Sequence, residues 1–264
     1  MKKIFILILL SLITLTGCAQ EKREENHIKL GMIGSDSVVW NYIIEELAKE
    51  DIKLEIVAFS DYPQVNAAVD QGEVDLNAFQ HQAYLDKENT DLGYDIVAIG
   101  KTVIAPMGLY SENIKDISEI KENDIIALPN DVTNGGRALQ LIASTGLIKL
   151  KDTPIPSLKD IVENKLNLEF MEMSAATIPG ALKDVALAAI NSGIAVDAGF
   201  QPATDSIVFE EVDINSDNPY INIIATNRKD KDRPEFKKIL DIYYSDKVKE
   251  LIIKDSKGAS IPVW

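Results

Sequence analysis

The stretch Ile28-Lys29-Leu30-Gly31-Met32-Ile33-Gly34-Ser35-Asp36-Ser37-Val38-Val39-Trp40 decides the fold class, because a β-type run passes directly into a helical pattern. The mainly apolar residues 28–33 predict a strand. The side-chain oxygens of residues 35–37 can cap a helix start, and apolar residues at four-residue spacing predict a helix from Val38 to about Lys49. A strand that leads into a helix is the repeating unit of an α/β protein.

The same alternation continues along the chain. Further strands are predicted at 53–59, 74–78, 124–128, 166–172, 185–190 and 221–226, and further helices at 63–71, 135–145, 178–183 and 233–253. The fully apolar run 185–190 is typical of a strand buried on both faces. Two apolar runs within 94–110, separated by Gly100 and Pro106-Met107-Gly108, predict that the chain crosses there between two lobes.

The N-terminal segment has the pattern of a secretory signal. Lys2 and Lys3 precede an apolar run from Ile4 to Leu15, which has the length of a signal-peptide core and is shorter than the roughly 20 residues that span a bilayer. The small residues Thr16 and Gly17 then lead into Cys18, the only cysteine. We therefore predict export and no disulfide. The alternative is a cleaved signal followed by a chance cysteine, although an unpaired thiol is unusual in a secreted protein.

Composition narrows the range of partners. The 264 residues carry a formal charge of −15, which becomes −17 once the two lysines of residues 1–17 are removed. Basic residues form no cluster in the sequence, which argues against a nucleic-acid partner. An acidic body is also repelled by an anionic membrane surface, so membrane attachment should depend on a lipid. The polar residues 20–26 predict a flexible spacer.

Aromatic residues gather after the strand predicted at 74–78. Phe79, His81 and Tyr84, with Tyr62 upstream, fall at the edge where open α/β sheets bind ligands. These rings could surround an apolar ligand that carries a thioether, or they could be core residues. His81 could be a general base, a metal ligand or a pocket wall. A site with several histidines is excluded because His27 is the only other one, and no G-x-S-x-G nucleophile is present.

A second candidate site is Pro129 to Arg137, between a predicted strand and helix. Asp131, Thr133 and Asn134 can cap the helix. Gly135-Gly136 could let the backbone approach a ligand, and free N–H groups at a helix start favour an anion. The guanidinium of Arg137 matches a carboxylate in bidentate fashion, or it could form a surface ion pair. Neither a phosphate-binding loop nor a complete dinucleotide fingerprint is present, so no cofactor is expected.

Several strings in the chain together resemble the NlpA/MetQ family of methionine-binding lipoproteins, which are substrate-binding components of ABC importers. They are the lipobox at Cys18, Asp61-Tyr62, residues 77–81 with 84–86, residues 129–131 with 133–134 and 136–137, residues 160–164, Ile190-Asn191, residues 218–222 and residues 261–264. The chain departs from the family pattern at Ala83 and Val132, where proline is usual, at Ile194, where tyrosine is common, and at Gly34 to Ser37.

The resemblance implies an α/β, two-lobed, periplasmic-binding-protein-like fold of type 2, with a ligand cleft between the lobes. The implied organisation is a signal peptide (1–17), a lipidated N-terminus with a flexible linker (18–27), a first lobe (28–108 and 224–264) and a second lobe (109–223). Cys18 would carry the lipid, with palmitate among its acyl chains. The protein would then be anchored to the cell membrane on its extracytoplasmic side.

The resemblance also implies a function: a monomer that captures L-methionine or a derivative and delivers it to an ABC permease and its ATPase, without metal, cofactor or catalysis. Tyr62, Phe79, His81 and Tyr84 would line the side-chain pocket. Arg137 would hold the carboxylate, and Asn191 and Asn222 would bond the backbone groups of the amino acid. The alternatives are a binding protein for another apolar amino acid or a short methionyl peptide, an exported hydrolase that uses His81, and a surface adhesion protein.

Overall fold

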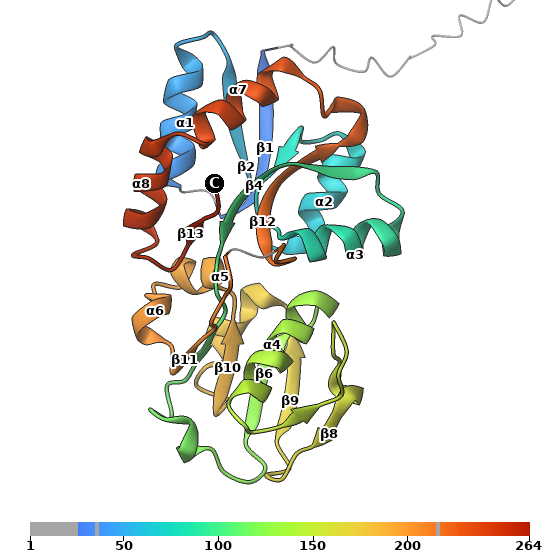
Figure 1. Ribbon diagram of the computed structural model, residues 1–264, viewed down its shortest axis with the longest axis vertical. Helices are drawn as coiled ribbons and strands as arrows, with labels where there is room; N and C mark the ends of the chain where they lie inside the picture. Colours follow the sequence, from blue (N-terminus) through green and yellow to red (C-terminus); the bar gives the residue numbers. More distant parts are fainter. Residues whose placement is uncertain (1–25, 35–36, 215–216) are drawn as a thin grey trace, which may run out of the picture.

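The computed structural model describes residues 26–34, 37–214 and 217–264, which fold into two lobes (Figure 1). The predicted signal peptide, Cys18 and most of the predicted linker lie outside the described residues. No helix in the described part of the chain is both long and apolar enough to cross a membrane.

The first lobe is built on a six-stranded mixed sheet. In spatial order its strands are β13 (Ile261–Pro262), β4 (Ile96–Ile104), β12 (Ile221–Asn227), β3 (Leu76–Asn77), β1 (His27–Ile33) and β2 (Lys53–Phe59). Strand β1 is parallel to β2 and β3, whereas β12 is antiparallel to both of its neighbours. The late strand β12 therefore lies in the middle of a sheet that the N-terminal part of the chain begins.

Helices cover both faces of this sheet (Figure 1). Helices α1 (Val38–Ala48), α7 (Pro234–Tyr243) and α8 (Asp246–Asp255) bury Trp40, Phe236 and Val248 in one core. Helices α2 (Tyr62–Gln71) and α3 (Gln82–Leu92) bury Val69 and Leu85 in another.

The second lobe has a five-stranded sheet. In spatial order its strands are β11 (Val208–Phe209), β5 (Gly108–Tyr110), β10 (Leu187–Ile190), β6 (Ile125–Pro129) and β9 (Glu169–Met173). Helix α4 (Val132–Ser144) packs in the core on one face, and the 3₁₀ helix η3 (Ala175–Ala181) and helix α5 (Ser192–Asp197) pack in the core on the other. Shorter elements are β7 (Lys149–Leu150), β8 (Ile161–Glu163) and α6 (Pro202–Asp205).

The chain passes between the two sheets along two connecting segments. The first, Ala105 to Met107, joins β4 to β5, and the second, residues 210–220, joins β11 to β12. Strand β12 lies wholly in the first sheet, so the predicted lobe boundary between residues 223 and 224 falls inside a strand. The predicted boundary between residues 108 and 109 likewise falls inside a strand, β5, and the division into lobes otherwise stays a prediction.

Local sequence signals account for several elements. The strand predicted at 53–59 is β2. Helix α2 begins one residue before its prediction, because the Asp61 carboxylate caps it, and it ends at Gly72, whose φ of 76° is left-handed. The helix predicted at 178–183 is wrong: the chain there forms the 3₁₀ helix η3, which contains Pro179, and proline lacks the N–H that a helix interior needs.

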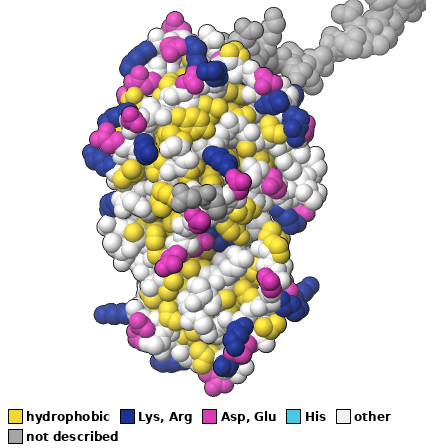
Figure 2. Space-filling model, viewed as in Figure 1, with side chains coloured by type: hydrophobic (Ala, Val, Ile, Leu, Met, Phe, Trp, Pro, Cys, Tyr) yellow, Lys and Arg dark blue, Asp and Glu magenta, His cyan; other side chains and the backbone are white. Residues whose placement is uncertain are grey.

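Charged side chains are distributed over both lobes. Figure 2 shows Lys and Arg interspersed with Asp and Glu on one face of the molecule, so the basic side chains form no continuous patch on that face.

Candidate functional site

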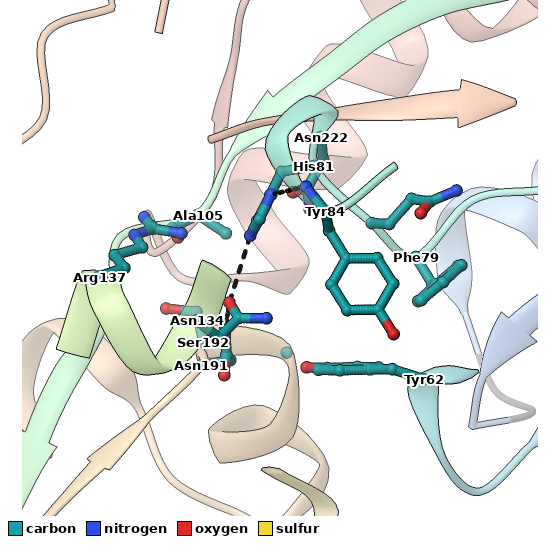
Figure 3. Close-up of a pocket in the computed structure, with 12 residues that line it drawn as sticks. Tyr62, Phe79, His81, Tyr84, Ala105, Asn134, Arg137, Asn191, Ser192 and Asn222 are labelled. Carbon is teal, nitrogen blue, oxygen red and sulfur yellow. Dashed lines mark hydrogen bonds between the residues drawn. The ribbon is translucent and has the colours of Figure 1, made fainter. Parts of the chain in front are cut away.

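Three aromatic rings of the first lobe form one end of a cavity. Tyr62 begins α2, Phe79 follows β3, and Tyr84 lies in the first turn of α3. The centroid of the Tyr62 ring lies 5.7 Å from that of Phe79 and 6.0 Å from that of Tyr84, and the Phe79 and Tyr84 centroids are 5.9 Å apart. These separations are typical of attractive aromatic pairs. Together the rings make an apolar corner (Figure 3).

A buried amide network fixes the turn that carries Phe79. Asn66 and Gln80 exchange two hydrogen bonds of 2.8 Å, and Asn77 Nδ2 donates to Asn66 Oδ1 at 2.9 Å. All three side chains are buried. Because a buried amide without partners is costly, this network favours a single arrangement of the turn.

His81 caps helix α3 from the wall of the cavity. Its Nδ1 accepts the backbone N–H of Tyr84 at 3.1 Å, so Nε2 carries the ring proton and donates to Asn134 Oδ1 at 3.2 Å (Figure 3). Burial, and secondly the nearby positive charge of Arg137, lower the pKa of His81 from 6.5 to about 3. His81 is therefore a neutral donor that bridges the two lobes, and both of its ring nitrogens are engaged.

Asn134 connects several polar groups of the site. Its Oδ1 accepts from His81 and from Asn191 Nδ2 at 2.7 Å, and its Nδ2 donates to the Asp131 carboxylate at 3.0 Å. The other end of the Asn191 amide, Oδ1, is buried and has no hydrogen-bond partner among the described residues. Since a buried unpaired acceptor is costly, Asn191 Oδ1 is suited to accept a hydrogen bond from a ligand.

The start of helix α4 is capped by Asp131, one of the side chains that the sequence suggested. Asp131 is the cap and accepts the Asn134 N–H at 2.9 Å, so the anion at this helix start belongs to the protein itself. A Cβ on Gly135 would lie 2.7 Å from the carbonyl oxygen of Pro129, and one on Gly136 would lie 2.9 Å from that of Pro156. The glycines therefore permit close packing within the protein, and neither lines the cavity. That they also let a ligand approach the backbone stays a prediction.

Arg137 is a buried ion-paired residue on the next turn of α4. Its side chain is only 3% exposed. Nε lies 3.0 and 3.1 Å from the two Glu210 carboxylate oxygens, Nη2 lies 2.5 Å from Glu210 Oε2, and Nη2 also donates to the Ala105 carbonyl at 3.1 Å. The guanidinium carbon lies 4.6 Å from the Tyr220 ring centroid. In this structure the bidentate partner is thus Glu210, whereas Nη1 makes no hydrogen bond with any described residue.

These groups surround one cavity of about 80 Å³. All the residues predicted from the sequence line it: Tyr62, Phe79, His81, Tyr84, Arg137, Asn191 and Asn222. Arg137 lies at the opposite end from Phe79 and Tyr62 (Figure 3). The structure brings these residues together, while their roles toward a ligand stay predictions.

The lining also includes residues that sequence reasoning missed, namely Gln80, Ala105, Asn134, Ser192 and Gly193. The sequence predicts Asn134 only as a possible helix cap. Within residues 26–34, 37–214 and 217–264, no group of three or more His, Cys, Asp or Glu side chains is arranged to hold a metal ion.

Comparison with known proteins gives consistent matches over nearly the whole chain. The family model described as NlpA lipoprotein matches residues 28–264. The D-methionine-binding lipoprotein MetQ of Salmonella typhi is 41% identical over 263 residues, covering 97% of this chain and 95% of that protein. The MetQ of Escherichia coli K12 is 39% identical with the same coverage.

Solved structures agree with these matches. A nutrient-binding protein from Burkholderia cenocepacia bound to methionine is 40% identical, with a TM-score of 0.84 over 90% of this chain and 100% of that one. The substrate-binding protein of a methionine transporter from Streptococcus pneumoniae is 36% identical, with a TM-score of 0.85 over 90% and 96%.

Proposed function

The chain belongs to the NlpA lipoprotein family, and from this premise we propose that it is the substrate-binding lipoprotein of an ABC importer that captures methionine or a close derivative. The observation that carries this proposal is the division of the cavity into an apolar end and a polar end. An amino acid with an unbranched apolar side chain matches both ends at once.

The apolar end suits a thioether side chain. Tyr62, Phe79 and Tyr84 present their rings to the cavity, and aromatic rings make favourable contacts with a thioether sulfur. A long, unbranched side chain can reach this corner while the backbone groups of the ligand stay near Arg137.

The polar end suits a zwitterion. Arg137 Nη1 is available to donate to a carboxylate, and the unpartnered Asn191 Oδ1 can accept from an ammonium group. Asn222, which pairs with His81 through a β-bridge, lines the same end and can bond a further ligand polar group.

The relatives support this ligand class. The Salmonella relative is named a D-methionine-binding lipoprotein, and the Burkholderia protein holds methionine. Other apolar amino acids and short methionyl peptides share the same chemistry and are the competing ligands, because one or two methylene groups in an apolar pocket change affinity by only about 1–3 kcal/mol.

Membrane attachment and partners follow from the same proposal. Cys18 carries the lipid that holds the protein to the extracytoplasmic side of the cell membrane, and the monomer delivers its ligand to a permease driven by an ATPase without catalysing a reaction. Cys18→Ser should abolish acylation and release the protein from the membrane fraction. A substituted protein that is still acylated would contradict this attachment.

Calorimetry on protein that has been unfolded, dialysed and refolded tests the ligand. L-methionine, D-methionine, norleucine, glycyl-methionine, lysine and glutamate should be titrated separately. We expect methionine to bind more tightly than norleucine, which replaces the sulfur with a methylene, and the charged amino acids not to bind. Tighter binding of lysine or glutamate than of methionine would contradict the proposed function.

A further inference from the structure

We propose that Glu210 selects the charge class of the ligand: by pairing with Arg137 it restricts the cavity to zwitterions, and it fixes the carboxylate anchor to the segments that connect the lobes. This inference rests on the proposed function, and it adds a positioning residue that does not itself line the cavity.

Glu210 contacts two of the three guanidinium nitrogens of Arg137. Its two carboxylate oxygens face Nε and Nη2, at 2.5–3.1 Å. The Ala105 carbonyl accepts from Nη2 as well, at 3.1 Å. Of the guanidinium nitrogens, only Nη1 is left without a hydrogen bond to a described residue. The ion pair therefore sets the direction in which Arg137 can donate to a ligand.

Glu210 is itself held by the backbone of the other connecting segment. Its carboxylate accepts the Met107 N–H at 2.8 Å, and its own N–H donates to the Met107 carbonyl at 2.9 Å. Glu210 begins the second connecting segment, and Ala105 and Met107 belong to the first. Because Arg137 comes from helix α4 of the second lobe, these contacts join the anchor to both segments.

The pair also determines the charge that a ligand meets. The negative charge of Glu210 compensates the buried cation, and His81 beside it is neutral. A ligand that brings both a carboxylate and an ammonium keeps this balance. Without Glu210 the buried guanidinium would lack a counter-ion, and the site would then favour an anion over a cation.

Three ligands with the same side chain but different charges test whether the site prefers a zwitterion, an anion or a cation. Methionine is a zwitterion, 4-(methylsulfanyl)butanoate keeps only the carboxylate, and methioninol keeps only the ammonium. Glu210→Gln removes the charge with little change in shape, and Glu210→Asp keeps the charge but shortens the side chain. Glu211→Gln is the matched control, because Glu211 is the exposed neighbour and undergoes the same change in charge.

Calorimetry should give the ratio of butanoate affinity to methioninol affinity for each protein. We expect Glu210→Gln to raise this ratio at least about tenfold over the parent, equivalent to about 1.4 kcal/mol. Glu210→Asp should leave the ratio near that of the parent while weakening methionine binding, and Glu211→Gln should change neither. An unchanged ratio in Glu210→Gln, or an equal rise in Glu211→Gln, would overturn the proposal.

NMR of arginine-labelled protein provides a readout that does not depend on the ligand. The Nε–H signal of Arg137, assigned by its loss in Arg137→Lys, should exchange slowly with water in the parent and quickly in Glu210→Gln. If the parent protein does not bind methionine, the proposed function is contradicted. The exchange rate of the Nε–H signal then still tests whether Glu210 holds Arg137. Equally fast exchange in both proteins would overturn the role of Glu210.

Discussion

His81 and Asn134 meet across the cleft, with Nε2 of the imidazole 3.2 Å from Oδ1 of the amide. Each residue is also bound within its own lobe, His81 to the N–H of Tyr84 and Asn134 to the Asp131 carboxylate. The direction of the bond is fixed, because the backbone N–H can only donate to Nδ1 and Nε2 must therefore carry the proton. A protonated His81 would have to break its cap on α3.

This bond predicts a pH dependence of stability. The folded protein holds the pKa of His81 at about 3, against 6.5 for an ordinary histidine. As the pH falls below 6.5 the unfolded chain takes up this proton first, so the free energy of unfolding decreases until about pH 3. Between pH 7 and pH 5 this one group should cost about 2 kcal/mol.

Urea unfolding at pH 7 and pH 5 checks this value. His81→Asn keeps a side chain that can cap α3 but does not titrate. The variant should lose about 2 kcal/mol less than the parent over this interval. Equal losses in the two proteins would show that His81 is not held neutral.

Phe79→Ala should weaken methionine binding by about 2–4 kcal/mol, by analogy with the truncation of a large buried side chain. The ring contacts both Tyr62 and Tyr84, so its removal opens the apolar corner. Phe170→Ala is the control, since Phe170 packs in the core of the second lobe away from the cavity. Calorimetry should measure the methionine affinity of both variants. A folded Phe79→Ala protein that binds methionine as tightly as the parent protein would refute the pocket assignment.

Arg137→Ala should weaken methionine binding by about 2–5 kcal/mol, because it removes the partner of the ligand carboxylate. Methioninol, which lacks that carboxylate, should lose much less. Arg228→Ala provides the comparison, as its ion pair with Asp95 is exposed at the surface. The assignment of Arg137 as the carboxylate anchor fails if methionine and methioninol lose the same affinity.

Gly135→Ala should destabilise the fold by about 1–3 kcal/mol, because the new Cβ would lie 2.7 Å from the Pro129 carbonyl oxygen. Alanine would otherwise favour the helix by up to about 1 kcal/mol, so the expected sign is opposite to that of helix propensity. Gly180→Ala meets no atom within 4 Å and is the control. Thermal unfolding measures both, and a more stable Gly135→Ala protein would contradict the packing argument.

The elements that could be predicted from the sequence are those with local signals. Ser37 and Asp61 cap α1 and α2, and the apolar residues 187–190 are all buried. Helix α3 was missed because only Tyr84 and Leu85 are buried along it, so it lacks an apolar stripe. Its cap is the ring nitrogen of His81, which is not among the usual capping groups.

The residues of the site likewise fall into those that local sequence signals predict and those that they do not. The four ring residues could be predicted because they lie near the end of one predicted strand. Arg137 could be predicted because it is a charged residue just after the start of a predicted helix. Glu210 could not be predicted, since it lies 73 residues from Arg137 and its role arises only when the two lobes are assembled. In this structure Nε and Nη2 of Arg137 face Glu210, and a bidentate contact of Arg137 with a ligand carboxylate stays a prediction.

The place of β12 in the first sheet has a consequence for the order of folding during synthesis. All the strands of the second sheet lie between Gly108 and Met173 or between Leu187 and Phe209, so this sheet can close as soon as residue 209 has emerged. The first sheet must wait for Ile221–Asn227 to pair between β3 and β4. Until then β3 and β4 have unpaired edges, and such edges promote aggregation. The lobe that begins first along the chain is therefore completed last, and a chain truncated before β12 leaves it open.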